Sequence, residues 1–253
     1  MENLSTYFLL FIIYSFLGWI MEVIDCSIIE KKLVNRGFLI GPVCPIYGCG
    51  AVIITLMLSN YKDDWIIVFC MAVILCGILE YFTSWAMEKM FNTRWWDYSH
   101  NKFNINGRIC LETMIPFGLL GLAIIYVLNP FFYNLLNSIP QNITNALSII
   151  LLIIFIIDIT LSFKVISKVT KTLKNISIDN KKDSTNEITK KVKETIKDMW
   201  GGKRLLEAFP TFETFKAKVK EVATDTVEKS KKVIEKSKEV ANKKIEIKKK
   251  KKK

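Results

Sequence analysis

The sequence predicts an all-α, polytopic membrane helix bundle with a basic, partly helical cytoplasmic tail. Of its 253 residues, 51% are hydrophobic, and they gather in long runs. Crossing a bilayer as a helix takes about 20 mostly apolar residues. Residues 1–163 carry 8 Lys/Arg and 11 Asp/Glu, whereas residues 164–253 carry 28 and 13. This difference in charge predicts two regions, one in lipid and one in water. They are a transmembrane domain over 1–165 and a lysine-rich tail over 166–253.

A first helix is expected over residues 4–26, and it is apolar except along one stripe. The stripe consists of Ser15, Gly18, Glu22 and Asp25 or Cys26, whose spacing of three and four puts them on one face. A carboxylate in a membrane helix is costly in lipid and therefore faces the bundle interior. Glu22 is expected either to pair with an arginine and hold helices together, or to serve transport or catalysis.

The polar loop 27–39 leads into IGPVCPIYGCG at 40–50, which holds two prolines and three glycines. Inside lipid, irregular backbone is tolerated only where protein or a watery cavity satisfies its hydrogen bonds. Either a second helix, over about 45–58, begins raggedly here, or a broken segment lines a cavity.

The third helix is expected over 65–90, after a tight turn at 60–64, and it carries a second polar stripe. The stripe recurs at helical spacing as Gly77, Glu80 or Tyr81, Ser84 and Glu88. Two such stripes facing each other would form a polar seam.

Two further helices are expected over 109–129 and 142–163. Glu112 lies in the first turn of the fourth, where the helix dipole favours a negative charge, so it needs no functional explanation. The fourth helix is expected to end at Asn129-Pro130, and a loop without charges leads to the fifth. The fifth helix carries Asp158 and Ser162 one turn apart.

Loop charge predicts the orientation in the cell membrane, because cytoplasmic loops are rich in lysine and arginine. The loops at 27–39 and 91–108 carry the cations, and the tail is strongly basic; the turn at 60–64 has one lysine against two aspartates. Five helices with the N-terminus outside place every basic segment, including the C-terminus, in the cytoplasm.

The loop 91–108 holds RWWDYS at 94–99. Tryptophan and tyrosine favour the membrane interface, and Asp97 beside Arg94 suits a simple ion pair. A polar ligand is the other interpretation. The candidate substrate- or ion-binding residues are Glu22, Arg36, Tyr47, Glu80, Glu88, Arg94, Asp97 and Arg108.

The tail shows a weak amphipathic pattern over about 203–247 and ends in six lysines. Such a helix could lie on an anionic lipid surface; a solvated, partly disordered tail is the alternative. No nucleic-acid partner is expected, because no aromatic residue is interleaved with the lysines after Phe215.

Enzyme and metal motifs are absent from the sequence. It has no GxxxxGK[ST], GxSxG, HExxH or GxGxxG, no CxxC pair, and a single histidine. No cofactor, metal or catalytic residue is therefore expected, and the six cysteines suit core packing.

Five strings occur in order: GWxxE (18–22), NRGFLxGPxxPIYGxG (35–50), EY (80–81), RWWDYS (94–99) and FNxxGRICL (103–111). Together they resemble the bacterial family of CmpB-type ABC-transporter permeases, also called ABC-transporter type IV, over about residues 5–140. The resemblance implies transport, and a separate ATPase subunit docked on the cytoplasmic loops. The motif residues expected to shape the structure are Asn35, Gly37, Gly41, Pro42, Pro45, Gly48, Trp95, Trp96, Asn106 and Gly107.

The favoured function is that of a transporter permease subunit whose glutamates bind a cation, a proton or a basic group in the membrane. Because five helices give an incomplete pathway, a homodimer or a partner is expected. One alternative is a membrane-embedded enzyme acting on a lipid-linked substrate through Asp97 and His100. Another is a structural or regulatory membrane protein acting through its basic tail.

Overall fold

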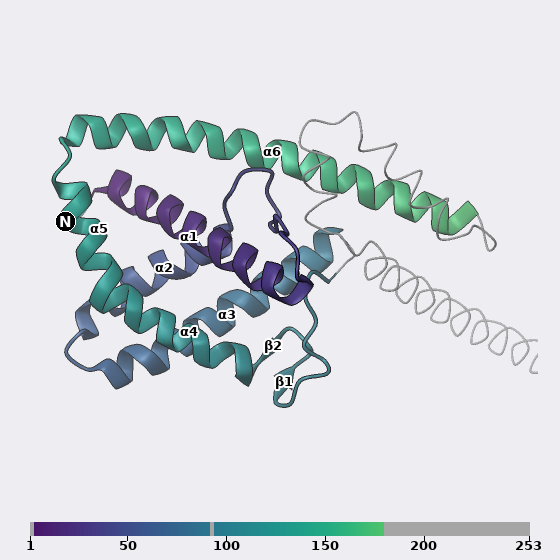
Figure 1. Cartoon of the computed structure of the whole chain (residues 1–253), viewed down its shortest axis with the longest axis horizontal. Helices are drawn as coiled ribbons and strands as arrows, with labels where there is room; N and C mark the ends of the chain where they lie inside the picture. Colours follow the sequence, from purple (N-terminus) through teal and green to yellow (C-terminus); the bar gives the residue numbers. More distant parts are fainter. Residues whose placement is uncertain (1–2, 92–93, 180–253) are drawn as a thin grey trace, which may run out of the picture.

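The computed structural model describes residues 3–91 and 94–179, which form a helical bundle with one short β-hairpin (Figure 1). The helices are α1 (Leu4–Glu30), α2 (Pro45–Leu58), α3 (Trp65–Phe91), α4 (Leu111–Ala123), α5 (Asn129–Asn137) and α6 (Gln141–Asp179). A 3₁₀ turn at Ser59–Tyr61 follows α2, and a π-helical turn at Ile124–Leu128 joins α4 to α5. Strands β1 (Asn104–Ile105) and β2 (Ile109–Cys110) pair antiparallel. The all-helical membrane bundle predicted from the sequence is confirmed.

The helices run back and forth along one direction, so the connections gather at two ends (Figure 1). One end holds the loop between α1 and α2 and the β-hairpin before α4, and α6 runs toward it; we call it the loop end. The opposite end holds the turns after α2 and α5. Helix α1 packs on α2 and α3 on α4, with α2 also against α3, while α6 lies along α1 and touches α3. Both basic loops therefore share one end of the bundle.

Four of the helical stretches are long and apolar enough to cross a membrane, namely Leu4–Ile29, Trp65–Phe91, Leu111–Asn137 and Gln141–Lys168. The second helix is an exception, because with its 3₁₀ turn it covers only Pro45–Tyr61. A helix of 14 residues spans about 21 Å at 1.5 Å per residue, short of the roughly 30 Å hydrocarbon core. An irregular segment precedes it, so the interpretation as a broken element is favoured over a full second span.

Several helix ends differ from the sequence-based prediction. Helix α1 continues to Glu30, whereas the fourth begins only at Leu111 because 109–110 pair as β2. The fourth helix was predicted to end at Asn129-Pro130, which is wrong: helical structure continues to Asn137. The wide π turn just before Pro130 makes room for a ring that would clash with the carbonyl four residues earlier in a regular helix.

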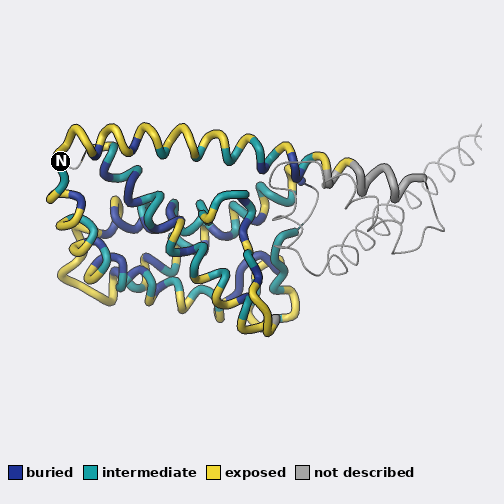
Figure 2. The backbone as a smooth tube through the Cα atoms, turned by 45° about the horizontal axis from the view of Figure 1, so that its top comes forward, coloured by how far each residue is buried: buried dark blue, intermediate teal, exposed yellow. Residues whose placement is uncertain are grey.

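Helix α6 also differs, since it continues to Asp179 and not to 163, with no break at the expected domain boundary of 165. It is the least buried of the four spans, and Figure 2 shows an exposed edge along most of its length. Its exposed side chains include a run of isoleucines, Ile149, Ile150, Ile153, Ile154, Ile156 and Ile157. Such a face suits lipid. The expected tail helix at 203–247 lies outside the described residues.

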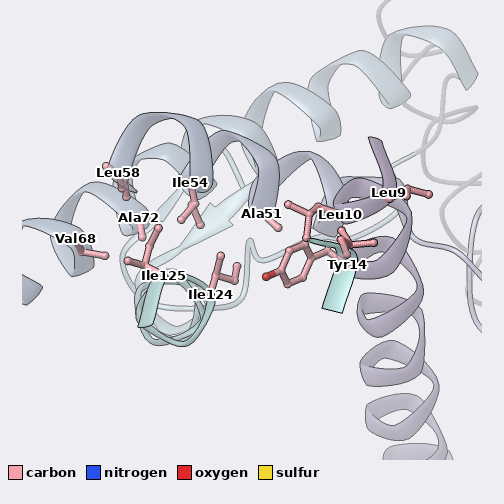
Figure 3. Packing of buried hydrophobic residues seen from close by; sticks show 11 residues of the cluster. Leu9, Leu10, Tyr14, Ala51, Ile54, Leu58, Val68, Ala72, Ile124 and Ile125 are labelled. Atoms are coloured by element: carbon pink, nitrogen blue, oxygen red, sulfur yellow. The ribbon is translucent and has the colours of Figure 1, made fainter. Parts of the chain in front are cut away.

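The apolar core lies in the half of the bundle away from the loop end, as its residues show. Figure 3 shows how ten of these side chains, which it labels, lie against one another. It is built by α1, α2, the first turns of α3 and the π turn, through Leu10, Ile54, Val68, Ala72 and Ile125 among others. One buried polar chain crosses it: the Tyr14 hydroxyl donates to Asn129 Oδ1 at 2.7 Å, and Asn129 Nδ2 donates to Thr55 Oγ1 at 2.9 Å. The core thus fixes the spacing of the helices that carry charge at the other end.

Candidate functional site

The predicted binding residues gather at the loop end of the bundle. Glu22 comes from α1, Tyr47 from the first turn of α2, and Glu80 and Glu88 from α3, while the two loops supply Arg36, Arg94, Asp97 and Arg108. These side chains comprise four carboxylates and three guanidinium groups, one negative charge more than positive. How they are paired decides where that excess lies.

Glu22 has two partners from the first hairpin, which we define as α1, α2 and their loop. The Tyr47 hydroxyl donates to Glu22 Oε1 at 2.8 Å, and Arg36 Nε lies 3.6 Å from Glu22 Oε2. Arg36 also donates through Nη1 to Cys26 Sγ at 3.0 Å. Because the Arg36 side chain is 47% exposed, this ion pair is a loose, rim contact.

Close approach of α1 and α2 brings Tyr47 to Glu22. The Tyr47 ring lies over Gly18, where a Cβ would overlap it, and Gly48 lies against Ser15 and the Phe11 carbonyl in the same way. Glu22 follows Gly18 by one turn, so the phenol oxygen of a tyrosine lying over Gly18 reaches the carboxylate. This explains why GWxxE and PIYGxG occur together.

Glu88 has two arginine partners from the second hairpin, which we define as α3, α4 and their connection. Arg108 Nη2 lies 2.6 Å and Arg94 Nε 3.1 Å from Glu88 Oε2. Arg108 is the more buried, with its side chain 11% exposed, and its Nη1 donates to Ser84 Oγ at 3.3 Å. Arg94 Nη1 lies 3.9 Å from Asp97 Oδ1, so the predicted Arg94–Asp97 ion pair is present but long.

The loop before α4 holds its arginines through backbone hydrogen bonds. Trp96 Nε1 donates to the Arg108 carbonyl at 3.0 Å, and the Tyr98 amide donates to the Gly107 carbonyl at 2.8 Å. Gly107 has φ +67, and a Cβ there would lie 2.7 Å from Asp97 Oδ1. Asn106, also left-handed with φ 54, donates to the Tyr81 hydroxyl at 2.9 Å. The segments RWWDYS and FNxxGRICL are therefore hydrogen-bonded to each other and form one folded loop.

Among the described residues, no cation is bonded to Glu80, in contrast to the other three carboxylates of the site, Glu22, Glu88 and Asp97. The Tyr98 hydroxyl donates to its Oε1 at 3.1 Å. The residue is only 6% exposed, and its Oε2 has no hydrogen-bond partner among the described residues. A buried, unsatisfied carboxylate oxygen is rare in folded proteins and indicates a missing ion, water or ligand. Glu80 is therefore the carboxyl group of the site whose neighbours among the described residues do not balance a negative charge.

Both tyrosine-bound carboxylates affect the Tyr98 phenol. Burial raises the pKa of the Tyr98 phenol, and the charges of Glu80 and, more weakly, Glu22 raise it further. We name Glu22, Tyr47, Glu80 and Tyr98 the carboxylate–tyrosine cluster. Each polar stripe therefore places one glutamate against a tyrosine, Glu22 of α1 with Tyr47 and Glu80 of α3 with Tyr98.

The irregular segment 38–44 closes one side of the site and is held by α6. Asp158 Oδ2 accepts from the Gly41 amide at 2.9 Å, and Ser162 Oγ accepts from the Ile40 amide at 2.9 Å. A Cβ at Gly41 would lie 2.5 Å from that carboxylate oxygen. Phe38 packs against Trp95 and Phe163, with ring centroids 5.3 Å away in each case. Protein groups therefore satisfy this backbone within the membrane protein.

The remaining motif residues have structural contacts near the site. Asn35 Oδ1 accepts a hydrogen bond from Trp19 Nε1 at 3.2 Å. Gly37 has a backbone φ of 147, and Pro45 is the first residue of α2. Pro42 is exposed. Sequence reasoning did not single out Tyr98, Asp158 or Ser162 as site residues. The one-turn spacing of Asp158 and Ser162 on an apolar helix was the available signal, but their partners are 117 and 122 residues away.

The described residues contain no group of three or more His, Cys, Asp or Glu that could hold a metal ion. In the comparison with protein families, the model described as "Putative ABC-transporter type IV" matches residues 9–163. This match contains α1 to α5 and the first part of α6, and so every residue of the site. No curated protein and no solved structure matches the chain.

Proposed function

Because the chain belongs to the ABC-transporter type IV family, we propose that it is a membrane permease subunit whose carboxylate–tyrosine cluster is an intramembrane polar site. The observation that carries this proposal is the buried Glu80, with an unpartnered oxygen on a helix long and apolar enough to span the bilayer. Ionisable groups within membrane helices are costly and mark substrate, ion or proton pathways. Glu80 and Glu22 would bind a cation, a proton or a basic group, and Arg36, Arg94 and Arg108 would balance charge at the rim.

The proposed orientation places the N-terminus outside and the loop end in the cytoplasm. Arg36 and the exposed Lys31, Lys32 and Lys102 lie in the loops at that end, whereas the turn at the other end carries Lys62 beside Asp63 and Asp64. This charge asymmetry supports the orientation. Single cysteines replacing Asp63 or Lys102 in a cysteine-free chain test it. In intact cells an impermeant maleimide should label position 63 and not position 102; the reverse pattern overturns the orientation.

A separate ATPase subunit is the proposed partner, because the chain contains no nucleotide-binding motif of its own. The loops at the loop end are the proposed docking surface. A homodimer would complete a pathway that one short helix, α2, leaves incomplete, and the basic tail would bind anionic lipid. The enzyme alternative gains no specific observation, since Asp97 accepts the Ser99 amide and faces Arg94 while His100 is exposed.

The test is purification from native membranes at native expression level, followed by reconstitution of the purified assembly in nanodiscs. A stoichiometric ATP-binding subunit is expected, with ATP hydrolysis that falls at least about tenfold in a Glu80→Gln variant. Glu112→Gln is the matched control, because Glu112 is an exposed carboxylate whose Oε2 accepts from Asn101. An intact, folded protein that reproducibly lacks such a subunit would overturn the proposal, as would normal hydrolysis in Glu80→Gln.

A further inference from the structure

The two tyrosine-bound carboxylates allow the missing group at Glu80 to be identified by comparison. At Glu22 one oxygen accepts from a tyrosine and the other faces a guanidinium group, that of Arg36. At Glu80 one oxygen accepts from a tyrosine and the other faces no bonded group among the described residues. The second hairpin has two arginines in this region, but both are bonded to Glu88, two turns further along α3. The guanidinium partner that completes Glu22 therefore has no counterpart at Glu80.

The surroundings of Glu80 restrict what could fill that place. A divalent metal would take several carboxylate or imidazole ligands, and no such group exists among the described residues. Among the described residues, the group bonded to Glu80 is the neutral Tyr98 hydroxyl, so a single positive charge would balance the ionised carboxylate. A cation with N–H donors would both supply that charge and satisfy Oε2, as Arg36 does beside Glu22.

From this geometry, and resting on the proposed function, we propose that Glu80 Oε2 is the binding point for one ammonium or guanidinium group of the transported ligand. Tyr98 holds the other carboxylate oxygen and so fixes the direction in which Oε2 accepts. Arg36, on its loose ion pair with Glu22, occupies the equivalent position in the first hairpin. The substrate class is therefore organic cations that carry N–H donors.

Two isomeric monovalent cations make a matched pair of probes. n-Butylammonium has three N–H donors, whereas tetramethylammonium has the same formula and charge but none. The full-length protein in nanodiscs is titrated with each at constant ionic strength, and the melting temperature is followed by tryptophan fluorescence. n-Butylammonium should raise the melting temperature saturably and tetramethylammonium should not, because a ligand that binds the folded state stabilises it.

Variants assign the effect to Glu80. Glu80→Gln should weaken n-butylammonium binding about tenfold or more, and Tyr98→Phe should weaken it by a smaller factor while keeping the carboxylate. Glu112→Gln should bind as the unaltered protein does. Tyr98→Phe also keeps the test valid if Glu80→Gln fails to fold.

Three results would overturn the inference: no saturable response to n-butylammonium, the same response in Glu80→Gln, or an equal response to tetramethylammonium. The melting temperature could instead depend on Glu80 and on pH but on neither cation. That result would mean that Glu80 binds a proton, and it would also overturn the inference. If n-butylammonium fails to bind but the native ATPase complex needs Glu80, the proposed function stands without this inference. If it binds and no ATPase subunit exists, the site stands without the permease function.

Discussion

The two hairpins of this bundle use the same components in different ways. In each, the first helix carries a carboxylate toward the loop end, and an asparagine and an arginine follow in the loop. A proline comes 10 residues after that asparagine, and a glycine comes 13 residues after it in the first hairpin and 12 in the second. These residues are Asn35, Pro45 and Gly48 in the first hairpin and Asn106, Pro116 and Gly118 in the second. In the first hairpin, Glu22 alone takes both the tyrosine and the arginine. In the second, Glu80 takes the tyrosine and Glu88 takes the arginines.

This division of roles has a physical consequence. A carboxylate with a cation beside it can remain charged at moderate cost, whereas a buried carboxylate without one retains a large desolvation penalty. Glu22 therefore has a cationic partner in the first hairpin, whereas Glu80 in the second has none among the described residues. The comparison indicates that function is to be sought at Glu80, which lacks a cationic partner among the described residues. Glu22, Arg36 and Glu88 have oppositely charged partners, which give each of them a structural role.

The largest expected effect compares the glycines at which the helices of each hairpin meet. Gly48→Ala should lower the free energy of unfolding by about 3 kcal/mol, because the new Cβ overlaps the Phe11 carbonyl, and backbone cannot move aside. Gly118→Ala should cost only about 1 kcal/mol, since its neighbours are the side chains of Phe69 and Val73. Unfolding by SDS titration in mixed micelles measures both.

Gly50→Ala is the control for these variants. A Cβ there would lie 3.6 Å from the nearest atom of Leu79, an ordinary contact, so stability should not fall. Equal losses at positions 48 and 50 would show that the first hairpin is not closed at Gly48.

A smaller effect is expected from the arginine pairs. Arg108→Gln should destabilise the protein by roughly 2 kcal/mol, because it removes a 2.6 Å ion pair with Glu88 and a hydrogen bond to Ser84 from a mostly buried guanidinium group. Arg36→Gln should cost less than about 1 kcal/mol, as its ion pair is long and half exposed. Thermal melting of the two variants in one detergent checks the order, and a larger loss for Arg36→Gln would contradict the contrast between the hairpins.

The smallest effect is expected from the tyrosines. Tyr98→Phe removes the one side-chain hydrogen bond found for Glu80 among the described residues and should lower the free energy of unfolding by about 1–2 kcal/mol. Tyr47→Phe leaves Glu22 paired with Arg36 and should lower it by about 0.5–1 kcal/mol. Melting temperatures of Tyr98→Phe with and without Glu80→Gln show whether the two effects are coupled. Strictly additive effects would mean that the hydrogen bond carries no stability.

The sequence by itself determined that this is a membrane helix bundle, because the length of an apolar run is a local property. Loop charge predicted that its basic loops share one end. The sequence also placed Glu22 and Glu80 on polar stripes, since the helical period is a property of the chain alone. Its motif strings indicated the family. The helix ends at Pro130 and 163 were wrong because a π turn and the packing of α6 override local signals.

Only the tertiary structure decided which charges meet. Arg94 and Arg108 could have neutralised any of Glu22, Glu80 or Glu88 on sequence grounds, yet both bond to Glu88. Asp158 holds Gly41 across 117 residues, and Tyr98 reaches Glu80 across 18, through a loop fixed by Trp96 and Gly107. Such partners depend on how far apart the helix axes lie and how each helix is rotated. Those quantities are set by packing at Gly18 and Gly48 and by the core, and not by any single stretch of residues.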